Sequence, residues 1–470
     1  MLTILSEIGK LTSPGLWKDP FKSFQWVGNL TYSPSDGCDL EVYTENNDLD
    51  IYHLSGEFEL IKWNGFDGVP CTIIDAFCQN STEFHKGGQR RTIFGNHMLY
   101  GIHIDSKTQP IARGLTFRSP ALVRWSQPKN ISVTWNGASN IVANYSSPPP
   151  VDFCLKGIAD VIMWWSASAK ACPMSDGEHR IVEQSAIQFS FLNEKSFNEL
   201  LDIISAMEFY ANFASNLFAG PPECNLLIKH DDMTVPRVLL HRGWYGKEHD
   251  HDPRSEYFRF CDVKENLSYS LSLWFESYKK HRDAVQLYSL IRTRKYDIQS
   301  ELLYLARCVE ALARDLFPCD EPSKAEDRKI GKVLRKALRE NFDTAFQEKF
   351  RDRICRKLVG LGGTSFQDRL IDLNKHLSGS IREVCPKFDS LVPIVAKWRN
   401  DLTHCNPREM LNQDIFDELC LCRDLLKMCV EAIFLRLMSV SDDRAARTLS
   451  HHYAWQFRKT LPKVLASRLS

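Results

Sequence analysis

The sequence predicts an α+β protein of more than one domain, in which a β-rich N-terminal region is followed by an all-α helical bundle. The chain has 470 residues, and a single hydrophobic core rarely serves more than about 250–300 residues. Apolar residues alternate with polar ones in the first half, whereas after about residue 260 they recur every three or four positions. The composition, 43% hydrophobic and 25% charged, is that of a globular protein.

Short alternating runs indicate the strands. In "FQWVGNLTY" (24–32) and "CDLEV" (38–42) alternate residues are apolar, and "SPSDG" between them has the composition of a turn. The run "SAIQFSF" (185–191) repeats the pattern and leads into a predicted helix near 196–214. "SSPPP" at 146–150 is typical of a local linker or a rigid turn.

Helical spacing of apolar residues dominates the second half. The predicted helices are 264–280, 298–317, 387–404 and 415–437. In the helix 387–404 the apolar stripe Phe388, Leu391, Val395, Trp398 and Leu402 predicts the buried side. The polar loop 241–256 comes just before the change of period, so we place a domain boundary after it. The predicted domains are a β-rich region at 1–260, a helical domain at 261–440 and a basic C-terminal helical extension at 441–470.

No segment of the sequence indicates export or membrane insertion. The N-terminus "MLTILSEIGKLTS" lacks the pattern of a signal peptide, and "IADVIMWWSASA" is too short to span a bilayer. Fifteen cysteines are scattered without framework spacing and without a CxxC pair. This usage is typical of reduced thiols, and we expect a cytoplasmic protein.

The charge is divided unevenly along a chain whose net charge is zero. Residues 1–270 contain 23 Lys and Arg against 32 Asp and Glu, and residues 271–470 contain 36 against 27. The net charges are therefore −9 and +9. A basic half favours binding of a polyanion, although a solvated surface would give the same count.

A basic helical stretch, "EDRKIGKVLRKALRE", supplies candidates for such binding. Four cations fall along one face of the predicted helix, namely Arg328, Lys332, Arg335 and Arg339. We predict that they contact the RNA or nucleic-acid backbone, the alternative being a solvated helix face. A second basic cluster follows in "EKFRDRICRKL" (348–358).

Two further motifs favour structural interpretations. The His-Asp-His-Asp run at 249–252 carries metal-ligand residue types, but it lacks the spacing of a metal site and favours a solvated linker. "GLGGTSF" (360–366) lacks the context of a phosphate-binding loop, and Ser365 with Asp368 is typical of a helix start. We therefore predict neither a metal nor a cofactor.

The stretch "KWRNDLTHCNP" (397–407) brings Arg399, Asn400 and His404 to the end of the helix predicted at 387–404. At about 100° per residue, Asn400 and His404 lie on one side, while Arg399 and His404 are about 140° apart. One rigid helix would not clamp a phosphate between these two side chains. Either the helix ends so that His404 turns, or two copies pool their residues across a twofold axis.

These residue types fit RNA cleavage without a metal. Histidine, with a reference pKa of about 6.5, can accept a proton from a 2′-hydroxyl or donate one to the leaving 5′-oxygen. Arginine stabilises the charge that develops on the phosphate, and asparagine can orient either group. Taken alone, the motif also fits a non-catalytic RNA- or nucleotide-binding module, or simply a polar helix end in an interaction scaffold.

In this context the motif resembles the Arg-polar-x3-His signature of HEPN ribonucleases. It follows the earlier predicted helix "LLYLARCVEALARDLF", and the β-rich region with "FQWVGNLTYSPSDGCDLEVY" precedes both. This order resembles the ApeA type of antiphage defence protein, which pairs an N-terminal domain with a C-terminal HEPN domain. Residues 441–470 lie outside the resemblance.

The resemblance implies a metal-independent endoribonuclease with Arg399, Asn400 and His404 as catalytic residues. It further implies a composite site in a homodimer or higher even multimer, and products with a 2′,3′-cyclic phosphate and a 5′-hydroxyl. The N-terminal domain is expected to sense a phage-derived trigger, after which RNA cleavage leads to abortive infection. Glu310, a polar residue on an apolar helix, either points into the same site or faces solvent.

Overall fold

The computed structural model describes the chain in segments and divides it into two compact units. The described residues are 11–18, 25–33, 37–44, 57–66, 68–83, 89–127, 130–136, 140–171, 179–218, 222–230, 233–241, 255–316, 329, 332–333, 336–337, 340, 365–404 and 413–467. The β-rich unit comprises Met1–Lys280, Arg292–Arg294 and Leu437–Val440, and the helical unit comprises His281–Ile291, Lys295–Arg436 and Ser441–Ser470.

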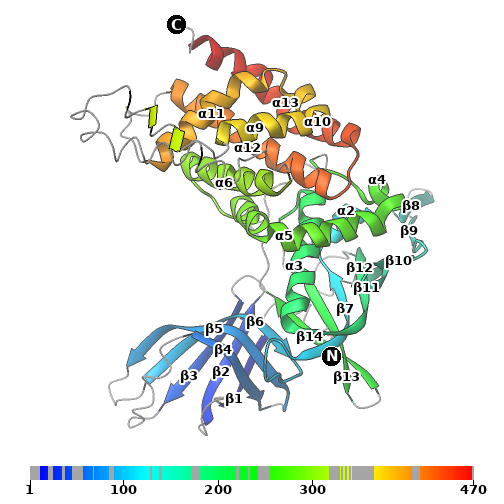
Figure 1. Cartoon of the computed structure of the whole chain (residues 1–470). Helices are drawn as coiled ribbons and strands as arrows, with labels where there is room; N and C mark the ends of the chain where they lie inside the picture. The colour runs from blue at the N-terminus through cyan, green and yellow to red at the C-terminus, as the bar shows by residue number, and fades with distance from the viewer. Residues whose placement is uncertain are drawn as a thin grey trace. The chain divides into compact units, whose positions relative to one another are not determined.

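Six antiparallel strands of the β-rich unit form a closed ring (Figure 1). They are β1 (Leu11–Lys18), β2 (Gln25–Ser33), β3 (Gly37–Thr44), β4 (Glu57–Gly65), β5 (Pro70–Glu83) and β6 (Gln89–Tyr100). The pairings run β1–β2–β3–β6–β5–β4 and return to β1. Every strand of the ring has a paired neighbour on each side, so the ring is a barrel, in which β1 and β4 pair over Gly15–Lys18 and Lys62–Gly65.

Three glycines lie side by side where this ring closes. Gly15 on β1 is paired with Gly28 on β2 and with Gly65 on β4. A Cβ added at Gly15 would meet the Asn64 carbonyl oxygen at 2.2 Å, and one at Gly28 would meet the Glu41 carbonyl oxygen at 2.1 Å. The backbones approach too closely here for any side chain, which is a recognised use of glycine in strands.

One cluster of buried apolar side chains joins five strands of the barrel. Its members are Leu30, Tyr32, Cys38, Leu40, Val42, Ile61, Trp63, Cys71, Ile73, Ala76, Ile93 and Met98. The alternation of Leu30, Leu40 and Val42 with polar neighbours is the pattern that predicted these strands. The burial of one face of each strand explains that pattern.

The end of β6 joins the barrel to the other antiparallel strands of the same 12-stranded sheet. His97–Tyr100 pairs with β14, and the order continues β14–β13–β7–β12–β11–β10. These strands are β7 (Pro110–Arg118), β10 (Val151–Leu155), β11 (Ala159–Ala171), β12 (His179–Ser196), β13 (Glu223–His230) and β14 (Met233–His241). A separate hairpin consists of β8 (Ile131–Asn136) and β9 (Asn140–Tyr145).

Helices complete the core of the β-rich unit. They are α2 (Pro120–Ser126), α3 (Phe197–Ser215), α4 (Phe260–Val263), η2 (Lys264–Asn266) and the first part of α5 (Leu267–Thr293). α3 begins at a capping box in which Ser196 and Glu199 satisfy each other's backbone N–H groups. It is buried on nearly all sides, and the Trp274 indole Nε1 donates to the Ala206 carbonyl at 2.8 Å.

The helical unit begins at an irregularity inside α5. His281 has non-helical backbone angles (φ −116°, ψ 24°), and the unit starts at this residue. Its other helices are α6 (Ile298–Leu316), α9 (Phe366–His376), α10 (Ser378–Val384), α11 (Phe388–Thr403), α12 (Gln413–Leu437) and α13 (Asp442–Ser467). α12 is central, because nearly all its residues from Glu418 to Leu435 are buried or half-buried.

One buried carboxyl group ties three helices of this unit together. Glu431 on α12 is fully buried and accepts hydrogen bonds from the Tyr288 and Tyr453 hydroxyls, each at 2.6 Å. Tyr288 lies on α5 and Tyr453 on α13. Since α13 also packs against α10, it belongs to this unit.

The predicted fold class, β-rich and then helical, is confirmed, and the predicted helices match α3, α6, α11 and α12 to within a few residues, whereas α5 continues from the predicted end at 280 to Thr293. The predicted domain limits at 260 and 440 stay a prediction. The main division between the two compact units follows Lys280, and Ser441–Ser470 falls in the helical unit. Within the described part of the chain, no helix has the length and apolarity needed to cross a membrane.

Candidate functional site

The motif residues lie at the C-terminal end of α11, which is fixed by its buried side. Phe388, Leu391, Val395 and Trp398 are all buried, as the predicted apolar stripe requires, and Leu402 is half-buried. The Trp398 indole Nε1 donates to the Glu418 carboxylate of α12, which is also buried. Burial of this stripe determines which residues at the helix end remain accessible.

Arg399 is held from two sides. Its Nη2 donates to Glu310 Oε1 of α6 at 2.7 Å, and its Nη1 donates to Asn400 Oδ1 at 3.1 Å. The guanidinium carbon lies 5.7 Å from the centre of the Phe366 ring of α9. The Arg399 and Glu310 side chains keep 29% and 22% of their surface exposed. The cation is therefore oriented but still within reach of solvent and of a ligand.

His404 caps the helix without leaving its helical position. Its backbone N–H still donates to the Asn400 carbonyl at 3.0 Å, and its own angles are φ −95° and ψ 6°. A residue that completes an i→i−4 bond carries its Cβ near the helical direction. The helix ends where the sequence predicted, but this end does not remove the angle of about 140° between Arg399 and His404.

Asn400 and His404 are both exposed, on the side of α11 away from the buried stripe. The Thr403 hydroxyl donates to the Arg399 carbonyl at 2.7 Å, so one of the last carbonyls of the helix is satisfied internally. The end of α11 thus offers an oriented guanidinium, an amide and an imidazole at a solvent-accessible surface.

Buried cysteines near this helix are unsuited to nucleophilic chemistry. Burial raises the pKa of the Cys385 thiol to about 12, and burial raises the pKa values of the Cys308 and Cys429 thiols further. The reactive form of cysteine is the thiolate, which such burial suppresses. The titratable groups that remain accessible at the end of α11 are therefore the better chemical candidates.

Of the four predicted RNA-contacting cations, Lys332 is exposed at a helical position. Arg328, Arg335 and Arg339 lie outside the described residues, as do the His-Asp-His-Asp run at 249–252 and the second basic cluster. Among the residues that the structure does describe, no group of three His, Cys, Asp or Glu side chains could hold a metal ion. Ser365 caps α9 in a box with Asp368, which confirms the predicted helix start.

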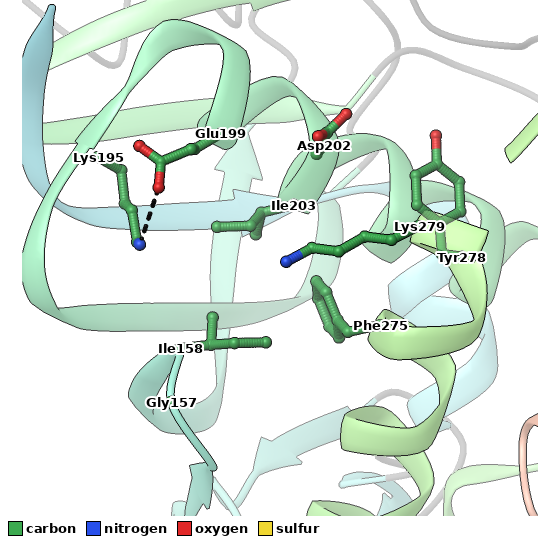
Figure 2. Close-up of a pocket in the computed structure, with 9 residues that line it drawn as sticks. All are labelled: Gly157, Ile158, Lys195, Glu199, Asp202, Ile203, Phe275, Tyr278 and Lys279. Atoms are coloured by element: carbon green, nitrogen blue, oxygen red, sulfur yellow. Dashed lines mark hydrogen bonds and ion pairs between the residues drawn. The ribbon is translucent and has the colours of Figure 1, made fainter. Parts of the chain in front are cut away.

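A small pocket in the β-rich unit was not predicted from the sequence (Figure 2). It has a volume of about 100 Å³ and is lined by Gly157, Ile158, Lys195, Glu199, Asp202, Ile203, Phe275, Tyr278 and Lys279. Lys195 is paired with Glu199 at 3.0 Å. These residues come from distant parts of the chain and share no motif, so only the fold brings them together.

Two family models match the chain. One, described as ApeA N-terminal domain 1, covers residues 14–216, and the other, described as Apea-like HEPN, covers residues 303–444. The second match includes Glu310, Arg399, Asn400 and His404. Comparison with curated proteins and with solved structures gave no significant match.

The matches first define a class: the chain has a β-rich N-terminal domain and a C-terminal HEPN domain, and HEPN domains are usually ribonucleases and often dimeric. The chain belongs more narrowly to the ApeA type of protein, since both of its characteristic domains are present in the expected order. This combination points to an antiphage-defence effector. The HEPN match ends at residue 444, so nearly all of α13 lies beyond it.

Proposed function

We propose that the protein is a metal-independent endoribonuclease effector of antiphage defence that acts in the cytoplasm. Arg399, Asn400 and His404 are its catalytic residues. The observation that carries the proposal is the geometry at the end of α11: Arg399 is oriented by Glu310 and Asn400, and His404 is exposed one turn further on. The HEPN match over the same residues supports it.

The reaction is an internal transesterification of RNA. The 2′-oxygen attacks the neighbouring phosphorus while the bond from phosphorus to the 5′-oxygen breaks. The imidazole of His404 takes the proton of the 2′-hydroxyl, a water molecule gives a proton to the leaving 5′-oxygen, and the imidazolium then releases its proton to solvent. The products are a 2′,3′-cyclic phosphate and a 5′-hydroxyl.

Two other polar groups complete the proposed site: Arg399 stabilises the transition state, and Glu310 orients Arg399. Arg399 donates to the phosphate oxygens, on which negative charge increases in the transition state. A guanidinium has five N–H donors, so contacts with Glu310 and Asn400 leave others for the phosphate. Glu310 acts as a positioning residue, because it fixes the direction of the guanidinium without touching the reacting atoms.

In a homodimer, Arg399 of one chain can meet His404 of the other at the end of α11. Because His404 keeps its helical position, Arg399 and His404 of one chain point about 140° apart. Two copies related by a twofold axis present the same surface to each other, and each can supply the group that the other lacks. We therefore propose a composite site in a dimer or a higher even multimer.

The first test uses a labelled single-stranded RNA and protein purified from phage-infected cells, in which any trigger-dependent activation has already taken place. The parent should produce fragments with 5′-hydroxyl and 2′,3′-cyclic phosphate ends in the presence of a chelator, and Arg399→Ala and His404→Ala should lose at least about 1,000-fold in rate. Lys397→Ala, which removes an exposed cation from the same helix, serves as the control. Full cleavage by both site variants would sink the proposal.

The same variants separate catalysis from binding. A protein that shifts RNA in a binding assay but never yields new 5′-hydroxyl ends is the non-catalytic RNA-binding module that the motif also fits. In cells, protection against phage should disappear with Arg399→Ala and His404→Ala and persist with Lys397→Ala.

We further propose that the N-terminal domain senses a phage-derived trigger and that the resulting cleavage aborts infection. The corresponding test isolates RNA from infected and uninfected cells that carry the parent or His404→Ala. Cleavage that depends on both infection and His404 is expected. Equal cleavage in uninfected cells would contradict a trigger.

A further inference from the structure

We propose that the exposed face of α13 binds single-stranded RNA and holds the substrate of the helical unit. The inference rests on the proposed ribonuclease function and names a surface for its substrate. Residues 444–467 contain five Lys and Arg and no Asp or Glu. This stretch follows the end of the HEPN match at 444, so the match does not account for this surface.

The basic residues lie on one face of the helix. On an ideal helix, Arg447, Arg458, His451, Trp455, Lys459 and Lys463 fall at about 0°, 20°, 40°, 80°, 120° and 160°. All six side chains are exposed. Trp455 stands at the middle of this arc, with cations on both sides of it, over a helix length of about 24 Å.

The opposite face of α13 is already used inside the helical unit. Its buried apolar residues are Ala445, Ala446, Leu449, Tyr453, Ala454, Phe457, Leu461 and Val464. Tyr453 donates to the buried Glu431, and α13 packs against α10. A helix that lies on a membrane needs its apolar face free for the lipid. Beyond its first turn, where Asp442 and Asp443 are exposed, what α13 presents to solvent is cationic with one aromatic ring, and this favours a nucleic acid.

Trp455 is the feature that a merely solvated face does not need. Its side chain is 65% exposed, and Lys459 Nζ lies 4.7 Å from the ring centre. Proteins that bind single strands combine cations along the backbone with aromatic side chains on which bases stack. The α13 face has both components, and Lys459 fixes the ring through a cation–π contact.

The test measures binding of a fluorescent 12-nucleotide single-stranded RNA by anisotropy. The full chain with His404→Ala is used, so that cleavage does not interfere. Added to this background, Trp455→Ala should raise the Kd about tenfold, and Trp455→Phe should retain most of the affinity. Arg458→Ala with Lys459→Ala should reduce the slope of log affinity against log salt by about 1.4.

The matched control is Arg382→Ala with Lys387→Ala, which removes two exposed cations from elsewhere in the same unit. The control should leave the Kd within about twofold. Equal losses in the control and in the α13 double variant would overturn a defined surface, as would an unchanged Kd in Trp455→Ala. Trp455-dependent binding to phosphatidylserine vesicles without RNA binding would overturn the proposal in favour of a membrane.

The outcome for α13 is separable from that for the catalytic site. If the α13 variants weaken RNA binding but the parent never cleaves RNA, the surface stands and the ribonuclease proposal fails. If the parent cleaves RNA while Trp455→Ala changes neither the Kd nor the KM for the 12-nucleotide RNA, the ribonuclease stands and the α13 surface fails.

Discussion

Two carboxyl groups of the helical unit lie in contrasting surroundings. Glu431, in the middle of α12, is fully buried and receives two tyrosine hydroxyls at 2.6 Å each. Glu310 on α6 keeps 22% of its surface and pairs with Arg399 at 2.7 Å. The neutral donors around Glu431 satisfy a buried group and join helices. Glu310 instead orients a cation that remains accessible, which is the requirement of a chemical site.

This contrast separates polar groups that hold a helical bundle together from polar groups that can serve a chemical site. A polar group that is enclosed and fully hydrogen-bonded contributes to the packing of α5, α12 and α13. A polar group such as Glu310, partly exposed beside a cation, instead orients a guanidinium whose remaining donors can reach a ligand. Variants of the two regions should therefore separate stability from activity.

The largest expected effect is the recovery of activity when two inactive variants are mixed. If one active site takes Arg399 from one chain and His404 from the other, mixed dimers of Arg399→Ala and His404→Ala contain one intact site of two. Random exchange of equal amounts makes half the dimers mixed, so about a quarter of the parental rate should return. The measurement is RNA cleavage after unfolding and refolding the two variants together. No recovery in demonstrated mixed dimers would show that each chain supplies its own pair.

Substitutions in the buried region around Glu431 should change the stability of the helical unit but not its cleavage rate. Glu431→Ala removes the acceptor for Tyr288 and Tyr453 and leaves a cavity, so unfolding of the helical unit should become easier by about 3 kcal/mol. Tyr453→Phe should cost about 1 kcal/mol. Urea unfolding measures both, and the cleavage rate per folded molecule should not change. A loss of cleavage rate in the folded Tyr453→Phe variant would contradict the separation of stability from activity.

Substitutions in the accessible region around Arg399 should change the cleavage rate but hardly the stability. Glu310→Gln keeps an oxygen acceptor for Arg399 but removes the charge, so kcat/KM should fall about tenfold with little loss of stability. Glu301→Gln is a matched control, because Glu301 lies on the same helix, is 21% exposed and faces Arg423 at 3.8 Å. Similar losses of rate in the two variants would argue against a specific role for Glu310.

The smallest expected effect lies in the β-rich unit, at the start of α3. Ser196→Ala removes the capping hydroxyl and should lower the stability of this unit by about 1 kcal/mol. The backbone N–H of Ser196, together with the neighbouring Lys195, lowers the pKa of Glu199 below its ordinary value of 4.5. A lowered folded pKa means that the ionised carboxylate stabilises the fold above pH 4.5, and that this stabilisation is lost as the pH falls through the folded value. Urea unfolding of the parent and Glu199→Gln should therefore differ at pH 7 and converge at low pH.

The sequence predicted local features well, because their causes are local. The stripe of Phe388, Leu391, Val395 and Trp398 indicated both the helix and its buried side, and the motif marked Arg399, Asn400 and His404. The contact between Arg399 and Glu310 joins residues 89 positions apart. The sequence showed Glu310 only as a polar residue on an apolar helix, since the packing of α6 on α11 decides what it meets.

The barrel shows the same limit in the β-rich unit. The alternation at Leu30, Leu40 and Val42 predicted strands, but not which strands pair or that they close into a ring. Gly28 was visible as a glycine within a strand pattern. The pairing of Gly15 with Gly28 and with Gly65 follows only from the register of β1 with β2 and β4, which the sequence does not show. Pairing over such distances in the chain depends on the whole fold.

The row of three glycines has an evolutionary consequence. Where backbones touch, as at Gly15 and Gly28, every substitution must be rejected, so these positions are expected to drift least among descendants of this gene. Because every strand of the ring has a paired neighbour on both sides, the connections between strands can lengthen or change composition with little effect on the pairing that protects the sheet from aggregation. Sequence differences in this domain should therefore accumulate in the connections between strands, while Gly15 and Gly28 stay glycine.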